Sequence, residues 1–130
     1  MFSDPKFKAI TKVHAILSQN PTIQQMVGDK IFPLNAPEKV NGVKVEGDLI
    51  LYRRDGLRVQ DNKMGRIYRK AIFYVVAISE NYKRSLDLAE AIHNALAKDH
   101  PAEDLRIRME DYTEEYIDKK FFQLLQFTIE

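Results

Sequence analysis

The sequence has 130 residues, the length of one domain, and a formal net charge of +1. It contains no cysteine, which excludes disulfides, thiolate metal sites and cysteine nucleophiles, and its balanced charge gives no general attraction to nucleic acid or membranes. The N-terminal residues do not resemble a signal peptide, and no apolar run approaches the ~20 residues of a membrane span. We therefore expect a soluble, intracellular protein.

The N-terminal segment predicts an amphipathic helix. Ser3 or Asp4 can cap it, and Pro5 suits its first turn, where the missing N–H costs nothing. The pair Asn20-Pro21 ends it, because the residue before a proline disfavours helical backbone. The apolar positions at helical spacing are Phe7, Ile10, Val13 or His14, and Leu17.

A shorter helical turn and extended pieces follow. Three apolar residues mark the turn, and Gly28 ends it. Residues 30–34, KIFPL, form a short extended piece limited by proline. Residues 35–47 are loop-like, with VKV at 43–45 as a candidate extended piece.

The middle of the chain predicts a β-hairpin. Residues 48–54, DLILYRR, and residues 66–79 alternate as strands do. Residues 55–65 between them contain two glycines and an Asp-Asn pair, which predict a turn or a longer loop.

The second of these strands, which contains YRKAIFYVVAIS at 68–79, is apolar on both faces. Phe73, Val75 and Ala77 share one face, and Ile72, Tyr74, Val76 and Ile78 share the other. The two helices of so short a chain can cover only one face of a small sheet. We therefore predict that either the Phe73 face or the Tyr74 face stays partly exposed in an isolated chain and is buried against a neighbour.

The C-terminal half predicts one helix and two strands. Ser85 is the expected cap of a clearly amphipathic helix, which ends near residues 99–101. Residues 105–110 alternate, with Leu105, Ile107 and Met109 inward. A polar hairpin at 111–118 leads to the last strand. In that strand Phe121, Leu125, Phe127 and Ile129 share one face, and Phe122 and Leu124 lie on the other.

These elements indicate a single α+β domain over residues 1–130. Runs of antiparallel strands punctuated by helices are typical of this class. We expect a mostly antiparallel, mixed sheet of four to five strands, with two main helices packed on one face.

The sequence shows no catalytic or cofactor-binding pattern. It has no glycine-rich phosphate loop, no GxSxG and no HExxH. The three histidines, at 14, 93 and 100, have no partner at ligand spacing, so polar helix-face or core positions suit them better than metal or acid–base roles. We expect a protein without enzymatic activity, cofactor or metal.

Two charge clusters stand out, on different hairpins. The basic cluster comprises Arg53, Arg54, Arg58, Lys63, Arg66, Arg69 and Lys70. It suits contact with phosphate or with an acidic protein surface, or it is a solvated hairpin.

The acidic cluster comprises Glu110, Asp111, Glu114, Glu115 and Asp118. It is an exposed hairpin or, less well supported by its spacing, a Ca²⁺ or Mg²⁺ site. Because the two clusters have opposite charges and lie on different hairpins, they favour a head-to-tail contact between copies of the chain. Pairing within one chain is the alternative.

Several stretches resemble the tail-terminator (tail-completion) proteins of long-tailed phages and prophages. Residues 26–33, MVGDKIFP, are similar to a segment that follows the first helix in that family. Residues 49–52, LILY, match its strand with a tyrosine near the end, and residues 73–96 match a strand followed by an alanine-rich helix. The resemblance covers about residues 7–130 and rests on packing positions.

The resemblance implies a structural, non-enzymatic subunit of the virion tail that is made in the bacterial cytoplasm. Such proteins form a ring, typically of six copies, that caps the tail tube and provides the surface for head–tail joining. The implied partners are further copies, the tube protein and the head–tail connector, with DNA passing through the lumen and no membrane. The alternative is a ferredoxin-like ligand-binding or regulatory module that acts as a dimer.

We predict that twelve residues lie at protein interfaces. They are Arg53, Arg54, Arg58, Lys63, Arg66, Tyr74, Val76, Glu110, Asp111, Glu114, Glu115 and Asp118.

Overall fold

A computed structural model of the chain describes residues 9–33, 39–40, 43–44, 47–61, 67–102 and 105–129; within these, no side chain is described for residues 9, 39–40, 43–44, 55–61 and 67–70. Over these residues the chain forms three helices and a six-stranded sheet, with a separate two-stranded hairpin. The α+β class is therefore confirmed. The expected numbers of four to five strands and two helices are too low.

The two N-terminal helices are joined through a single residue. Helix α1 spans Ala9–Gln19 and helix α2 spans Pro21–Val27. Asn20 between them accepts a hydrogen bond from the Ile23 backbone N–H at 3.1 Å and so caps α2. Gly28 then ends α2 with a φ of +60°, a conformation that favours glycine. The predicted cap of the first helix, at residues 3–5, lies outside the described residues.

The sheet has the order β1-β4-β5-β8-β7-β6. Strand β1 runs parallel to β4, and all other neighbours in the sheet are antiparallel. The strands of the sheet are β1 (Ile31–Pro33), β4 (Leu49–Asp61), β5 (Ile67–Ser79), β6 (Asp99–His100), β7 (Leu105–Ile117) and β8 (Lys120–Ile129). Strands β2 (Lys39–Val40) and β3 (Val43–Lys44) form the separate hairpin.

Strand β4 is much longer than predicted. Residues 55–61 were expected to be loop, but they continue the strand and pair with β5 as far as Asp61, opposite Ile67. A β-bulge between Arg54 and Gly56 absorbs one residue and keeps the two strands paired. Pairing with β5 therefore outweighs the tendency of these residues to form a turn. The rest of the predicted loop lies beyond the described residues.

Helix α3 spans Tyr82–Leu96 and begins earlier than expected. Its cap is Asn81, whose side chain accepts a hydrogen bond from the Arg84 backbone N–H at 3.0 Å. Ser85, the predicted cap, is fully buried within the helix. Asn81 takes this role because its side chain reaches the free N–H groups of the first turn.

Strand β7 extends through most of the predicted polar hairpin at 111–118. The acidic stretch 111–117 belongs to the strand, and the turn to β8 consists of Asp118 and Lys119, which both have positive φ. Two such residues form the tight turn that matches the twist of paired strands. Met109, expected to face inward, is 38% exposed. From Met109 onward β7 is an exposed outer strand, because the helices pack mainly on β5 and β8.

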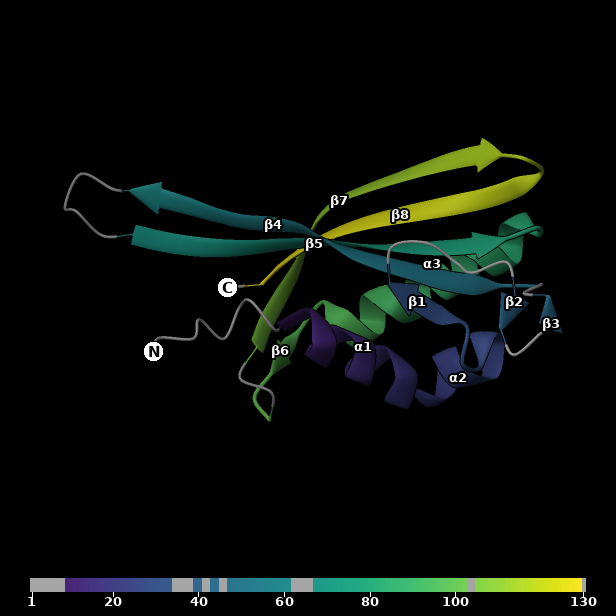
Figure 1. Cartoon of the computed structure of the whole chain (residues 1–130), viewed down its shortest axis with the longest axis horizontal. Coiled ribbons are helices and arrows are strands. Elements are labelled where there is room, and N and C mark those ends of the chain that lie inside the picture. The colour runs from purple at the N-terminus through teal and green to yellow at the C-terminus, as the bar shows by residue number, and fades with distance from the viewer. Residues whose placement is uncertain are drawn as a thin grey trace.

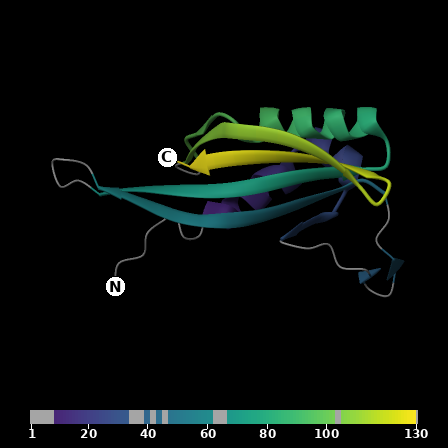
Figure 2. The ribbon, with the colours of Figure 1, turned by 90° about the horizontal axis from the view of Figure 1, so that it is seen from above.

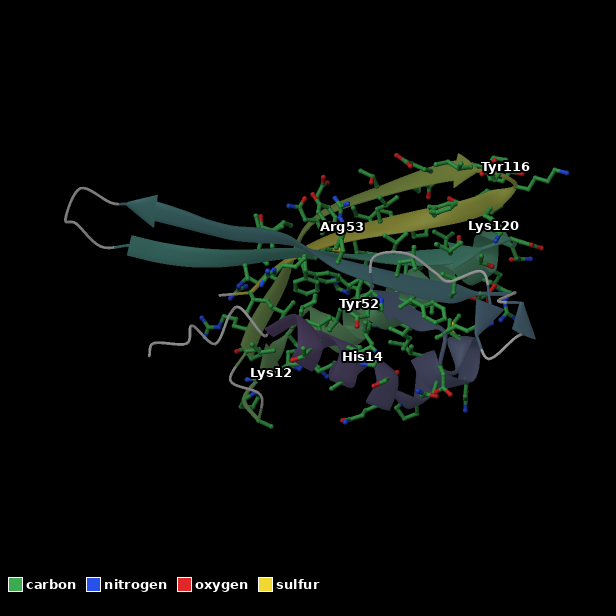
Figure 3. All side chains as sticks on the ribbon, viewed as in Figure 1. Lys12, His14, Tyr52, Arg53, Tyr116 and Lys120 are labelled. Carbon is green, nitrogen blue, oxygen red and sulfur yellow. The ribbon has the colours of Figure 1, made fainter. Side chains whose placement is uncertain are left out.

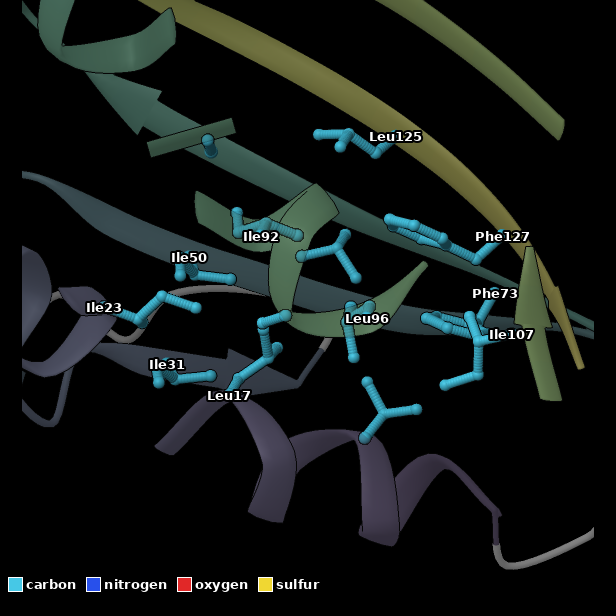
Figure 4. Packing of buried hydrophobic residues seen from close by; sticks show 14 of the residues in the cluster. Leu17, Ile23, Ile31, Ile50, Phe73, Ile92, Leu96, Ile107, Leu125 and Phe127 are labelled. Atoms are coloured by element: carbon cyan, nitrogen blue, oxygen red, sulfur yellow. The ribbon is translucent and has the colours of Figure 1, made fainter. Parts of the chain in front are cut away.

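The hydrophobic core lies between the helices and one face of the sheet (Figures 1 and 2). Phe73 of β5 stacks on Phe127 of β8, with ring centroids 5.3 Å apart. Leu17 of α1 and Ile92 and Leu96 of α3 pack into the same cluster (Figure 4). All three helices therefore cover the Phe73 face of the sheet.

Candidate interaction surface

The other face of the sheet carries the remaining apolar side chains of β5. We call it the open face, because no described helix packs over it in either ribbon view (Figures 1 and 2). Side chains alternate between the two faces along each strand, and paired residues on neighbouring strands share a face. The open-face residues are Leu49, Leu51 and Arg53 of β4; Ile72, Tyr74, Val76 and Ile78 of β5; Lys120, Phe122, Leu124, Gln126 and Thr128 of β8; and Arg108, Asp111, Thr113, Glu115 and Ile117 of β7.

The centre of the open face is partly exposed. Ile72 and Ile78 at its two ends are only 4% and 5% exposed, whereas Tyr74 and Val76 between them are half-buried. A hollow of about 430 Å³ lies at this centre and is lined by residues that include Tyr74, Val76 and Leu124. The prediction that one face of β5 stays partly exposed is confirmed for the Tyr74 face.

One row of polar and charged side chains crosses this face. Register aligns Arg53, Tyr74, Gln126 and Asp111 on four neighbouring strands. The Arg53 guanidinium lies over the Tyr74 ring, 5.5 Å from its centroid, which is a favourable cation–π distance. Figure 3 shows Arg53 above the sheet, while Tyr52 points toward the helices. The row begins with a cation on β4 and ends with a carboxylate on β7.

The predicted acidic cluster is divided between the two faces of β7. Asp111 and Glu115 lie on the open face, and Glu110, at the bulge, accepts a hydrogen bond from the open-face Thr128 hydroxyl at 3.2 Å. Glu114 lies on the helix side, and Asp118 lies in the turn. The division follows from the two-residue repeat of a strand. Glu110, Asp111 and Glu115 therefore form an acidic strip at one margin of the open face.

The predicted basic cluster is divided as well. Arg53 lies on the open face, while Arg54 pairs with Phe73 and lies on the opposite face. Arg58 belongs to β4, with only its backbone described, and Lys63 and Arg66 lie outside the described residues. Figure 1 shows the β4–β5 and β7–β8 hairpins pointing to opposite ends of the molecule. The described ends of the two hairpins therefore lie at opposite ends of the molecule.

A buried polar network, which the sequence did not single out, fixes the β7–β8 hairpin to α3. Gln123 is fully buried on the helix side, donates to the Ser85 hydroxyl at 3.2 Å and accepts from the Tyr112 hydroxyl. Ser85 in turn donates to the Tyr82 carbonyl at 2.6 Å. The two-residue repeat of β8 places Gln123 on the same face as Phe121 and Leu125, and this repeat is the sequence signal that could have placed it in the core.

Three tyrosine hydroxyls, two of them in or beside this network, have raised pKa values. The Tyr82 hydroxyl donates to Glu114, and this hydrogen bond is the main reason that the pKa of Tyr82 is raised. Burial, followed by the negative charge of Glu114, raises the pKa of Tyr112. Burial also raises the pKa of Tyr52, which packs beside the His14 ring at 5.5 Å. All three shifts favour the neutral hydroxyl, so none supplies a base near neutral pH.

The remaining charged and histidine side chains near the core have structural partners. Asp48 is 9% exposed and binds the Arg84 guanidinium at 2.6 Å, which joins the start of β4 to α3. His100 is buried, with Nε2 2.9 Å from the Leu96 carbonyl. Among the described residues, no group of three or more histidines or carboxylates is placed to hold a metal ion. No helix in this part of the chain has the length and apolar character needed to cross a membrane.

Comparison with known proteins gives a match at the level of fold. No protein-family model matches the sequence, and no curated protein matches it significantly. The structure is similar to a chain of the "Virion of native gene transfer agent (GTA) particle", with a TM-score of 0.66 and 15% sequence identity. The match covers 90% of this chain and 89% of that chain. At this identity the match establishes a shared fold over nearly the whole length of both chains.

Proposed function

We propose that the protein is a structural subunit of a phage-like virion, and that copies of it form a ring that caps the tail tube and joins it to the head. The observation that carries this proposal is the fold shared with a chain of a virion particle across about nine-tenths of both chains. The sequence resemblance to tail-terminator proteins, found independently of the structure, supports the same role.

The open face supplies a physical reason for assembly. Leu51, Tyr74, Val76 and Leu124 are half-buried there, and burying such surface contributes about 25 cal/mol per Å² of apolar area before the costs of association. The covered face already provides the core of the monomer, so the open face remains for a neighbour. Association through this face would stabilise the assembly without altering the fold of the subunit.

The distribution of charge favours a head-to-tail ring over a symmetric dimer. The basic β4–β5 hairpin and the β7–β8 hairpin, which carries Glu115 and Asp118 near its turn, point to opposite ends of the molecule. Two different surfaces that complement each other make a heterologous contact, and such contacts close into rings when the rotation between copies allows it. We propose six copies, non-catalytic, with the tube protein and the head–tail connector on the two ends of the ring and DNA in transit through its lumen.

Mass measurement and electron microscopy test this proposal. Light scattering on a size-exclusion column, over a hundredfold range of concentration, is expected to show a hexamer of the 15.1 kDa chain, and micrographs are expected to show rings. A dimer that binds a metabolite would favour the ligand-binding alternative. A protein that stays monomeric both alone and when mixed with a tail-tube protein from the same genome would contradict the proposed ring.

A further inference from the structure

We propose that the projecting end of the β4–β5 hairpin lies across the open face of a second copy, with its basic residues against the acidic strip of β7. We call this end the arm; it consists of residues 58–61 of β4 and 67–70 of β5. The inference rests on the proposed assembly and names the two surfaces that meet in it.

Among the described residues, the arm has no third strand beside it. Residues 58–61 pair with residues 67–70, and over the described residues neither segment has another strand beside it, because β8 pairs with β5 only from Ala71 onward. Figure 1 shows this ribbon extending beyond the helices and the rest of the sheet. An isolated two-stranded hairpin is at best marginally stable in water. Contact with a further surface would therefore stabilise the arm.

The charge of the arm calls for an acidic surface. Between residues 55 and 70 the sequence has five basic and two acidic residues. Register places Arg58 directly opposite Lys70, and like charges in this position destabilise a strand pair. Carboxylates from outside the arm would remove this repulsion. The β4–β5 hairpin would thereby gain stability on assembly.

The open face offers those carboxylates beside apolar surface. Asp111 and Glu115 are exposed on β7, and Leu124, one strand away on β8, is half-buried beside the apolar hollow. The arm contains Val59 and Ile67, so it also brings apolar residues. A ribbon with both basic and apolar residues matches a face that has both acidic and apolar ones.

A second copy is the natural source of this surface. The arm and the turn of the β7–β8 hairpin point to opposite ends of one molecule (Figure 1), and strand register places Glu115 near that turn. The arm therefore faces away from its own Glu115, and a second copy can present this carboxylate to it. Each copy then donates one arm and receives another, which is the arrangement of a heterologous ring. DNA is a different acidic partner, but it would leave the apolar centre around Val76 uncovered.

A reciprocal charge reversal tests the pairing. The face variant carries Asp111→Lys with Glu115→Lys, and the arm variant carries Arg58→Glu with Lys70→Glu. Each alone opposes like charges between copies, so we expect assembly at least about tenfold weaker than in the unaltered protein. A chain with all four substitutions, or an equimolar mixture of the two variants, restores opposite charges at every contact. Light scattering should show that both recover the assembly of the unaltered protein.

Two controls accompany the reversal. Asp87→Lys with Glu90→Lys makes the same change of charge on the exposed surface of α3 and should leave assembly unchanged. The neutral face variant, Asp111→Asn with Glu115→Gln, should weaken assembly less than the lysine variant does. Circular dichroism verifies that each chain is folded, so that loss of assembly is separated from loss of structure.

The outcomes distinguish this inference from the proposed function. If the unaltered protein forms rings and the two reversals do not compensate each other, the arm–face contact is wrong and the ring stands. If the arm variant assembles normally but loses affinity for double-stranded DNA, the arm binds DNA and the inference is also wrong. If the unaltered protein does not assemble even with the tube protein, both proposals fail.

Discussion

The two faces of β8 differ in what covers them, although they alternate along the same ten residues. Leu125 faces the helices and is 1% exposed, whereas its neighbour Leu124 faces away from them and is half-buried. The same contrast holds on β5 between Val75, which is fully buried, and Val76. A chain of this size therefore completes one core and leaves a second apolar surface unfinished. We interpret the first face as the source of folding stability and the second as the source of assembly.

The largest effect is expected on the covered face. Leu125→Ala removes a buried side chain from the core and should lower the free energy of unfolding by about 2–5 kcal/mol. Leu124→Ala is the matched control, because it makes the same truncation one residue away, and its cost in the dissociated chain should stay below about 1 kcal/mol. Urea denaturation at low protein concentration measures both. Equal losses would show that the two faces do not differ as described.

The open face should show the opposite pattern. Tyr74→Ala removes a half-buried aromatic ring and its cation–π contact with Arg53, and central aromatic residues often dominate interfaces. We expect the dissociation constant of the assembly to rise at least about tenfold, which corresponds to about 1.4 kcal/mol. Leu86→Ala on α3, where the side chain is 36% exposed, is the control and should leave this constant unchanged. Sedimentation over a concentration series gives both values.

The polar network behind β8 is expected to have a smaller effect on folding. Ser85→Ala leaves the buried Gln123 side-chain amide without its hydroxyl partner, which should cost about 1–2 kcal/mol of unfolding free energy. Ser18→Ala, which removes a hydroxyl that donates to the Ala15 carbonyl on α1, should be nearly neutral. Thermal unfolding compares the two. A neutral Ser85→Ala would show that the network does not hold the hairpin to α3.

The smallest effect concerns the exposed bond between Tyr82 and Glu114. The pKa of Tyr82 is raised in the folded chain, so its contribution to stability is present below about pH 10 and is lost as pH rises through the raised value. The difference in melting temperature between the unaltered protein and Tyr82→Phe should therefore shrink under alkaline conditions. In a Glu114→Gln background this dependence on pH should largely disappear. A difference in melting temperature that grows with pH would contradict the raised pKa of Tyr82.

The elements with strong local patterns were predictable from the sequence. The long apolar strand to Ser79 shows its two-residue repeat directly, and the 82–96 helix shows a clear amphipathic repeat. The exposed second face followed from counting the helices available to cover it. These features depend on patterns within one segment, which a single sequence displays.

The features that depend on distant partners were not predictable in the same way. Residues 55–61 carry turn-forming residues, and only their pairing with β5 makes them a strand. The acidic residues form one cluster on a predicted hairpin, but their pairing with β8 divides them between two faces. Gln123 has a polar side chain in an inward position, and its partner Ser85 is thirty-eight residues away. Local sequence does not encode such contacts.

The central claim is that a second copy covers the open face, and the accessibility of position 76 tests it most directly. The chain has no cysteine, so Val76→Cys introduces one unique thiol at the centre of the open face, and Glu90→Cys places another on the exposed surface of α3. Reaction with a thiol reagent is followed as each protein is concentrated from conditions where it is dissociated. We predict that the thiol at position 76 becomes protected as assembly proceeds, while that at position 90 stays reactive. Equal reactivity at both positions in the assembled protein would contradict the claim that a second copy covers the open face.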